Sequence, residues 1–340
     1  MSAPAVPLLL SVDGNSLLHR AYHAAATGRL LDDDGRPVWA MKGLIGFIAR
    51  AAARLRPDAL VVGFDCPDDS ARKADYPAYK GHRPDKPADL AEQLAEAPGL
   101  LRAAGFCTVV PRSYEADDVL ASSSEQARRN GWRSIVVTSD RDAFALIDAT
   151  TSVLRVRNGG LDEAILMTAA SLPDLYGVEP SQYRDYAALC GDSSDNLPGV
   201  RGFGAVTAAR LLATFGSVDA AWDALDNGDD AAVRAAVGDA AAESFASPET
   251  RDAVHRNRRL MRMRADLPLP DLDSARLPLD LASMRRALAE RGIRLGPSLW
   301  ALTGGAPPLS IEELPAALRP WMPISARRRR EPSPDQLTLF

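Results

Sequence analysis

The first half of the chain alternates short apolar runs with longer helical patterns. Four runs rich in Val, Ile and Leu are candidate strands: Leu8–Val12, Ala59–Phe64, Cys107–Val110 and Ser134–Val137. Because these runs lack polar alternation, they suit strands that are covered on both faces. Helical patterns such as 38–55 and 116–130 lie between them. This order predicts an α/β domain with a mainly parallel sheet flanked by helices.

The character of the chain changes near Tyr183, where strand-like runs fade and alanine-rich helical patterns continue to about Trp300. We therefore expect an α/β domain over residues 1–182 and a helical region over 183–303. Frequent Pro and Gly predict an irregular segment over 304–325. A basic block, two prolines and a short apolar end are typical of a flexible tail over 326–340.

Composition is that of a globular protein outside membranes. The chain has 340 residues, of which 46% are hydrophobic and 25% charged. The apolar run 6–12 is too short to span a bilayer and has no basic start, so we expect a cytoplasmic monomer. The three cysteines lie far apart without a CxxC pair, which favours small buried hydrophobes over a disulfide or zinc site.

Charge alone argues weakly against a nucleic-acid partner, because the formal net charge is −5. The distribution changes this picture, since many acids form short clusters after apolar runs and many bases lie in separate stretches. A metal site and a nucleic-acid surface on one molecule would give such a pattern.

Acidic residues follow nearly every predicted strand. Because strands of an open α/β sheet end at a common edge, these side chains are expected to converge there. Hard cations such as Mg²⁺ and Mn²⁺ prefer oxygen ligands, and packed carboxylates need cations between them to stay ionised. Taken singly, each acid has an ordinary explanation as a turn or helix-cap residue; jointly they predict a metal site. The candidates are Asp13, Asp65, Glu115, Asp117, Asp118, Asp140, Asp142, Asp192 and Asp195.

Other chemistries have little support in the sequence. His19 and His23 have helical i, i+4 spacing but no HExxH pattern. There is no GxSxG elbow and no GxxxxGK[ST] phosphate loop. The glycine-rich stretch 199–204 does not follow a predicted strand, which disfavours a dinucleotide fold.

Two further segments suit nucleic acid. In the first, Gly199, Arg201, Gly202 and Gly204 precede a predicted helix over 205–215. Close backbone approach and a helix N-terminus would together form a phosphate grip of helix–hairpin–helix type, although an ordinary turn is the alternative.

The second segment, Arg72–Lys86, alternates basic residues with aromatic ones. Basic groups neutralise phosphates and aromatic rings stack on unpaired bases, so we expect a mobile DNA-contacting loop; a solvated surface loop is the alternative. The candidate contacts in this loop are Arg72, Tyr76, Tyr79, Lys80 and Arg83.

Several of these motifs resemble those of a known family, the 5′ nuclease domain of bacterial DNA polymerase I and the related flap endonucleases. The resemblance runs from about Leu8 to about Leu269. It rests on the segments VDGNSL, VVGFD, YPAYKGHR, YEADDVL, VTSDRD and GDSSDNLPGVRGFGAVTAARLL, which occur in one order.

The resemblance implies a PIN-like α/β fold with a helix–three-turn–helix DNA-binding motif. It implies two divalent cations, Mg²⁺ or Mn²⁺. The first would be held by Asp13, Asp65, Glu115 and Asp117, the second by Asp140, Asp142, Asp192 and Asp195, with Asp118 supporting both. Lys80 and Arg83 would act at the scissile phosphate in a basic arch near residues 70–95. Tyr79 would stack, and the grip over 199–204 would also hold K⁺.

The implied activity is that of a 5′-3′ exonuclease and 5′ flap endonuclease that leaves 5′-phosphate and 3′-hydroxyl ends. Its substrates would be flapped, nicked or 5′-recessed DNA, including RNA-primed ends, in replication and repair. No polymerase domain follows, so a free-standing nuclease is expected. The last residues resemble a sliding-clamp-binding peptide, with Gln336, Leu337, Leu339 and Phe340 as contacts. The alternatives are a PIN-like RNase and a non-catalytic, clamp-tethered scaffold that binds DNA junctions.

Overall fold

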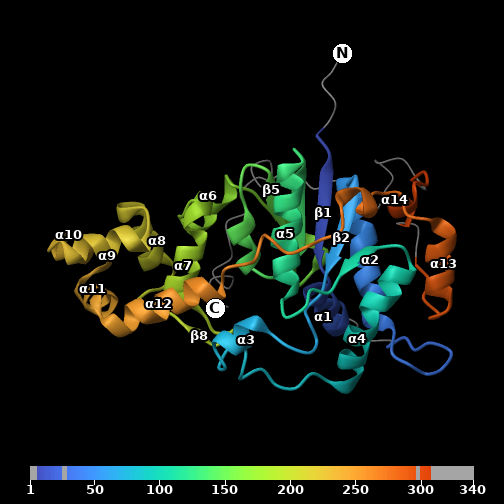
Figure 1. Cartoon of the computed structure of the whole chain (residues 1–340), viewed down its shortest axis with the longest axis horizontal. Helices are drawn as coiled ribbons and strands as arrows, with labels where there is room; N and C mark the ends of the chain where they lie inside the picture. Colours follow the sequence, from blue (N-terminus) through green and yellow to red (C-terminus); the bar gives the residue numbers. More distant parts are fainter. Residues whose placement is uncertain (1–5, 25–28, 296–298, 308–340) are drawn as a thin grey trace, which may run out of the picture.

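The computed structural model describes residues 6–24, 29–295 and 299–307, and Figure 1 shows their arrangement. At its centre is a six-stranded sheet in the order β3-β2-β1-β4-β5-β6. All neighbouring strands are parallel except β5 and β6, which are antiparallel. The strands are β1 (Leu8–Asp13), β2 (Ala59–Gly63), β3 (Cys107–Val109), β4 (Arg133–Thr138), β5 (Thr151–Arg157) and β6 (Gly160–Met167).

Helices cover the sheet on both faces, which explains the absence of polar alternation in the central strands. Leu10 and Val12 of β1 pack with side chains of α1 (Gly14–Ala24), α2 (Trp39–Leu55) and α4 (Ala88–Ala103). The alternate residue Leu9 belongs to the opposite layer, with Val119 of α5 (Ala116–Arg129). The predicted mainly parallel sheet flanked by helices is confirmed.

The sequence prediction missed β5 and β6, which lie at one edge of the sheet. Charged residues interrupt the apolar pattern of both strands: the half-buried Arg155 lies in β5, while the exposed Asp162 and Glu163 lie in β6. The edge strand β6 needs only one buried face, so its apolar residues form no continuous run.

The helical region lies beside the β5 end of the sheet, at the left of Figure 1. Its core joins Val136 and Val153 of the sheet to Leu211, Trp222 and Phe245 of the helices. The sheet and helices therefore share one continuous apolar cluster. The elements are η1 (Asp142–Leu146), α6 (Ser171–Tyr176), η2 (Pro180–Gln182), α7 (Tyr183–Cys190), α8 (Ala205–Phe215), α9 (Val218–Asp226), α10 (Asp230–Val237), α11 (Asp239–Ala246) and α12 (Pro248–Leu260).

After α12 the chain returns across α5 to the far side of the sheet, the orange path in Figure 1. It passes through η3 (Leu272–Ala275), α13 (Leu281–Ala289) and α14 (Trp300–Thr303). Arg291, just after α13, pairs with Glu96 of α4 at 2.6 Å and with Asp32 at 3.1 Å. None of the helices in the described ranges is long and apolar enough to cross a bilayer.

The predicted phosphate grip is built on a close backbone approach. It follows a short hairpin of β7 (Gly191–Asp192) and β8 (Leu197–Pro198) and leads into α8. A Cβ atom on Gly199 would lie 2.6 Å from the carbonyl oxygen of Leu189, whereas one on Gly204 would meet no atom within 4 Å. Gly199 is thus required by packing, and Gly204 leaves open space at the N-terminus of α8.

A matched pair of substitutions tests this difference. Gly199→Ala is expected to lower the free energy of unfolding by about 1–3 kcal/mol, because the added methyl group overpacks the backbone of α7. Gly204→Ala should change it by less than about 0.5 kcal/mol, the usual range for open surface positions. Chemical denaturation of both variants measures the two values, and equal destabilisation would contradict the packing argument.

Candidate metal centre

The carboxyl ends of β1 and β2 bring the first acids together. Asp13, the last residue of β1, accepts hydrogen bonds from the backbone N–H of Ser16 at 2.9 Å and from the Thr138 hydroxyl at 2.7 Å. Asp65, just after β2, accepts from the Asn15 amide at 2.7 Å and from the Ala116 N–H at 2.8 Å. Each carboxylate is oriented by neighbouring donors, as ligand side chains in a prepared site should be.

Asp117 completes this group from the first turn of α5. Its Oδ1 atom is buried and has no hydrogen-bond partner among the described residues. Burial raises the pKa of Asp117 well above its usual range, and repulsion from Asp13 and Asp140 adds to the shift. Burial also raises the pKa of Asp13 to about 7, with a further contribution from Asp65.

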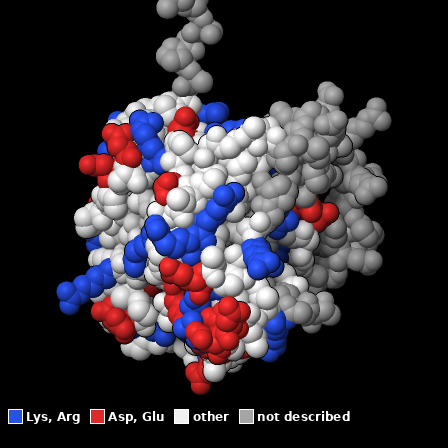
Figure 2. Space-filling model, turned by 90° about the vertical axis from the view of Figure 1, so that its right-hand side faces the viewer, with Lys and Arg blue, Asp and Glu red and all other residues white. Residues whose placement is uncertain are grey.

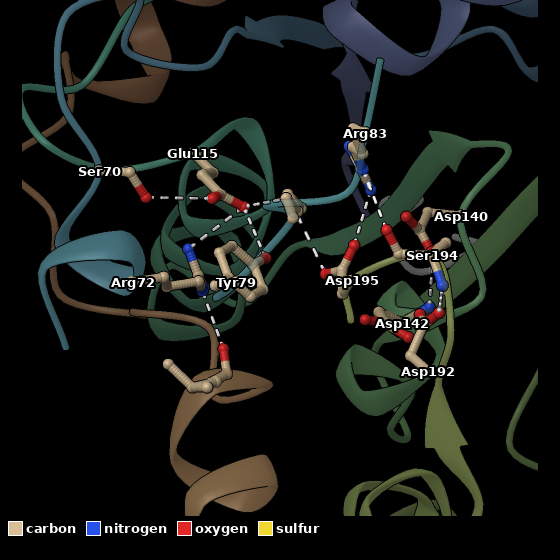
Figure 3. A network of polar contacts seen from close by, with 12 residues as sticks. Ser70, Arg72, Tyr79, Arg83, Glu115, Asp140, Asp142, Asp192, Ser194 and Asp195 are labelled. Carbon is tan, nitrogen blue, oxygen red and sulfur yellow. Dashed lines mark hydrogen bonds and ion pairs between the residues drawn. The ribbon is translucent and has the colours of Figure 1, made fainter. Parts of the chain in front are cut away.

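A second group of acids lies on η1 and on the β7–β8 hairpin, as Figure 3 shows. Asp142, Asp192 and Asp195 each offer one oxygen, and these oxygens lie within 4.8 Å of one another. Burial raises the pKa of Asp142 well above its usual range, followed by repulsion from Asp140 and Asp192. Asp140 accepts the backbone N–H of Asp142 at 3.0 Å, which holds it beside the cluster.

These residues suit divalent cations. A buried carboxylate oxygen without a donor and a compact group of three aspartates are costly arrangements unless a cation lies among them. Oxygen-only ligand sets match hard cations such as Mg²⁺ and Mn²⁺ rather than zinc, which is usually bound through nitrogen or sulfur.

Basic residues of the predicted arch lie against both groups. Lys80 forms a salt bridge with Glu115 at 2.8 Å and approaches Asp195 at 3.9 Å. Arg83 pairs with Asp195 at 2.6 Å and donates to the carbonyl of Ser194 at 3.0 Å. Lys80 and Arg83, with Asp13, Asp117 and Asp140, line one cleft of about 830 Å³. The cleft therefore carries acids and bases side by side.

Arg72 and Asp118 have a different environment from the one expected. Arg72 donates to both oxygens of Asp118 at 2.7 and 2.9 Å and to the carbonyl of Leu260 at 2.8 Å. Asp118 also accepts the backbone N–H groups of Glu115 and Arg264, at 3.0 and 2.7 Å. With every oxygen occupied, this geometry favours a structural link over a DNA contact for Arg72 and a metal contact for Asp118.

Tyr79 also departs from its expected stacking role. Its ring is 3% exposed within the core that joins the sheet to the helices. Its hydroxyl donates to Glu115 at 3.2 Å. Stacking on a base would require the ring to leave this core, so the geometry favours orientation of Glu115 instead. Tyr76 is half-buried, and the Arg256 guanidinium lies 4.8 Å from the centre of its ring.

The arch segment has more regular structure than the mobile loop expected from its prolines and glycine. Residues 71–75 form α3 (Ala71–Asp75), turns follow, and α4 begins at Ala88. The amide of Asn196 donates to the carbonyl of Ala78 at 2.8 Å, and the backbone N–H of Lys80 donates to the carbonyl of Asp195. These bonds fix the segment to the β7–β8 hairpin.

Sequence reasoning did not place the polar residues of α1 in the cleft, and it treated His19 and His23 only as a disfavoured metal pair. Asn15 bridges to Asp65 in both directions, donating through its side chain and accepting the Asp65 N–H at 3.1 Å. His19 and His23 line the same cleft. Burial, with the nearby charge of Lys86, lowers the pKa of His19 to about 4, so its ring is neutral near pH 7. The sequence offered one indication for Asn15, His19 and His23: they recur at helical spacing directly after Asp13, so they share a helix face near the acids.

The grip residues lie at the N-terminus of α8. Arg201 is exposed, and the backbone of Gly202 has a φ of +86°, a conformation that favours glycine. The buried Asn257 of α12 supports the loop by donating to the carbonyls of Ala188 and Pro198, at 3.1 and 2.9 Å. Gln336, Leu337, Leu339 and Phe340, proposed as clamp contacts, lie outside the described residues.

Comparison with known proteins gives matches over most of the chain. The family model for the 5′-3′ exonuclease N-terminal resolvase-like domain matches residues 8–177, and the model for the 5′-3′ exonuclease C-terminal SAM fold matches residues 178–282. DNA polymerase I of Mycobacterium tuberculosis is 35% identical over 293 residues. This alignment covers 86% of the chain and 31% of the relative, so the chain spans about a third of that protein's length.

Solved structures share the fold. Phage T5 5′-exonuclease with bound zinc ions has a TM-score of 0.62 at 20% identity, covering 76% of this chain and 90% of that one. The catalytic core of Rad2 in complex with a DNA substrate has a TM-score of 0.52 at 17% identity, covering 84% of this chain and 87% of that one. Both comparisons agree with the described sheet and helices.

Asp117→Asn tests the electrostatic cost of the acid cluster. Because the pKa of Asp117 is raised in the folded state, the wild type loses stability as pH rises above the unfolded value near 4. With EDTA at pH 8, the neutral variant should be more stable than the wild type by about 1–3 kcal/mol. At pH 3.5 or below the difference should shrink towards zero. Denaturant unfolding at several pH values measures the difference in free energy of unfolding between the two proteins. A difference that stays constant with pH would refute the buried Asp117 charge as its cause.

Arg72→Ala tests the buried pair with Asp118. It should lower the free energy of unfolding by about 3–5 kcal/mol, since it leaves a buried carboxylate without its cation. The control is Lys73→Ala, whose exposed side chain should contribute less than about 0.5 kcal/mol. Similar small effects for both variants would show that Arg72 is free for another role.

Proposed function

The chain belongs to the 5′-3′ exonuclease family, and on this basis we propose that it is a structure-specific 5′ nuclease acting on DNA. It hydrolyses phosphodiesters near a 5′ end as exonuclease and flap endonuclease, leaving 5′-phosphate and 3′-hydroxyl ends. This activity would serve DNA replication, by removing RNA-primed ends, and DNA repair. The observation that carries the proposal is the cleft in which Asp13, Asp65, Glu115, Asp117 and Asp140 lie with Lys80 and Arg83. The compact group of Asp142, Asp192 and Asp195 lies next to it, where Lys80 and Arg83 approach Asp195.

Two divalent cations, Mg²⁺ or Mn²⁺, belong to this proposal. Asp13, Asp65, Glu115 and Asp117 would hold one, and Asp140, Asp142, Asp192 and Asp195 the other. Such a pair of cations supplies an activated water at neutral pH and offsets the charge that develops on the phosphodiester. The unpartnered oxygen of Asp117 and the close oxygens of Asp142, Asp192 and Asp195 support this assignment.

Lys80 and Arg83 are the groups of this chain that would bind the scissile phosphate. The side chain of Arg83 is 48% exposed at the rim of the cleft, so its guanidinium can reach a phosphate by leaving Asp195. The Lys80 ammonium is held by Glu115 and lies deeper, at 19% exposure. Both positive charges would favour the more negative transition state over the bound substrate.

The remaining residues would hold and orient the substrate. The grip of Gly199, Arg201, Gly202 and Gly204 would bind a phosphate of duplex DNA at the N-terminus of α8, with K⁺ as an additional ligand. Flapped, nicked and 5′-recessed duplexes would all present such a backbone. Monomeric action, a cytoplasmic location and clamp binding through residues 336–340 belong to the same proposal.

Product sizing on a 5′-labelled DNA flap tests the activity. The wild type with Mg²⁺ or Mn²⁺ should release whole flaps, mononucleotides or both. Asp142→Asn should reduce the rate at least about 100-fold. A weakened metal site loses several kcal/mol of transition-state stabilisation, and each 1.36 kcal/mol lost lowers the rate about tenfold. Asp174→Asn, at an exposed acid of α6 outside both groups, is the matched control and should retain full activity.

Equal rates for wild type and Asp142→Asn would overturn the metal assignment. A matched RNA flap distinguishes the first alternative, since cleavage of RNA alone would identify an RNase. Binding of the flap without cleavage under every metal condition would identify a non-catalytic scaffold.

A further inference from the structure

A second large pocket lies on the other side of the segment that follows α12. Its volume is about 820 Å³, within the range of ligand sites. It opens between the end of α5, the region of η1 and α7, and residues 259–266. Met261 and Met263 line both this pocket and a narrow gap that contains Asp117, Asp142 and Asp195. One stretch of chain therefore separates the pocket from the acid centre.

The lining of this pocket is strongly basic. It carries two carboxylates, Glu125 and Asp266, and five guanidinium groups, those of Arg129, Arg184, Arg259, Arg262 and Arg264. Such an excess is notable in a chain whose formal net charge is −5. On the end face shown in Figure 2, by contrast, basic and acidic side chains lie intermixed.

Three of the five arginines are paired, but at exposed positions. Arg129 pairs with Glu125 at 2.7 Å, Arg264 with Asp266 at 2.6 Å, and Arg259 with Asp75 at 2.7 Å. The three arginine side chains are 47–67% exposed. Exposed pairs of this kind contribute little stability, so a polyanion can draw the guanidinium groups away at small cost.

The other two arginines are available to a ligand. Within the described part of the chain, neither Arg184 nor Arg262 forms a salt bridge; Asp219 and Asp266 are paired with Arg258 and Arg264 instead. The Nε atom of Arg184 is buried without a hydrogen-bond partner, which leaves a donor unsatisfied. The apolar side chains of Leu146 and Met261 lie in the same lining.

We propose that this pocket binds a nucleotide unit of the nucleic-acid substrate outside the acid centre. Arg184 and Arg262 hold its phosphate, because a planar guanidinium matches phosphate oxygens in a fork geometry. The apolar side chains of Leu146 and Met261 accommodate the sugar or base. This inference rests on the proposed DNA substrate, and a free 5′-mononucleotide product offers the same phosphate chemistry.

An occupant of this pocket would contact the segment that positions the arch. The carbonyls of Leu260 and Arg262 accept hydrogen bonds from Arg72, at 2.8 and 3.4 Å. The backbone N–H of Arg264 donates to Asp118, the partner of Arg72. Arg259 in turn pairs with Asp75 at the end of α3. A nucleotide held at Arg262 is therefore linked through backbone hydrogen bonds to α3 and the N-terminus of α5.

Binding measured in EDTA tests this site apart from catalysis. Without divalent cations the acid centre repels phosphate, so affinity for a fluorescent single-stranded oligonucleotide reports the basic surfaces. The variants are Arg262→Ala and the double variant Arg184→Ala/Arg262→Ala. The controls are Arg285→Ala for the single variant and Arg285→Ala/Arg286→Ala for the double variant, which remove the same number of charges at exposed positions of α13. Thermal unfolding of each variant shows whether it is folded.

We expect the double variant to bind at least about tenfold more weakly at low salt. Its slope of log affinity against log salt should fall by about 0.7, the value for one phosphate contact on a single strand. Arg262→Ala should weaken binding less than the double variant does, and both controls should match the wild type. Competition by deoxyadenosine monophosphate that is lost in the double variant would assign the pocket to free nucleotide as well. Its absence would assign the pocket to strand phosphates alone.

The inference would be overturned if the folded single and double variants bound the oligonucleotide with unchanged affinity and unchanged salt dependence. It would also be overturned if poly-glutamate, but neither deoxyadenosine monophosphate nor unlabelled oligonucleotide, competed for this pocket. Flap cleavage by the wild type distinguishes a failure of the second site from a failure of the proposed function. If the wild type cleaves flaps but the variants bind DNA as well as it does, only the second site is refuted. If the wild type neither binds nor cleaves DNA, the proposed function itself is refuted.

Discussion

Mutual repulsion among partly buried carboxylates is the constraint on which this structure depends. The parallel strands end at one edge of the sheet, where Asp13 is the last residue of β1 and Asp65 follows β2. Asp117 and Asp142 add further buried negative charge from short helical turns. Folding therefore places like charges together at a cost, which the rest of the molecule offsets with positive groups. Without cations among them, carboxyls in such an arrangement take up protons instead of staying ionised.

The chain supplies two kinds of positive charge to this edge. Arg72 is held in place, since its partner Asp118 is fully buried and its other donors reach the backbone carbonyls of Leu260, at the end of α12, and Arg262. Lys80 and Arg83 are held by carboxylates of the acid groups themselves, at positions open to the cleft. Under the proposed function, a substrate phosphate would replace a carboxylate as the partner of these two residues. The same loop therefore joins a fixed anchor to exchangeable contacts, and α12 supports both the anchor and the glycine grip.

The sequence predicted the acid-bearing sheet edge because apolar runs and the acids after them are local patterns. The four strands β1 to β4, α8 and the convergence of the acids followed from those patterns and from the topology of parallel sheets, whereas β5 and β6 did not. The pairing of Arg72 with Asp118 could not be predicted in this way, because it joins residues 46 positions apart and also involves the backbone near Leu260. The burial of Tyr79 likewise depends on helices that follow much later in the chain. Basic and aromatic residue types indicated chemistry, but only tertiary packing decides which of them face the solvent.

Proton release on metal binding tests the central claim most directly. Calorimetric titration of the wild type with Mn²⁺ at pH 6.5, in buffers of different ionisation enthalpy, gives the number of protons released per protein. Burial raises the pKa of Asp13 to about 7 and that of Asp117 well above its usual range, so carboxyls of the metal-free site are protonated near this pH. The account predicts release of about one proton or more, because ligand carboxylates must ionise to bind the metal. Tight Mn²⁺ binding with no proton release would contradict it.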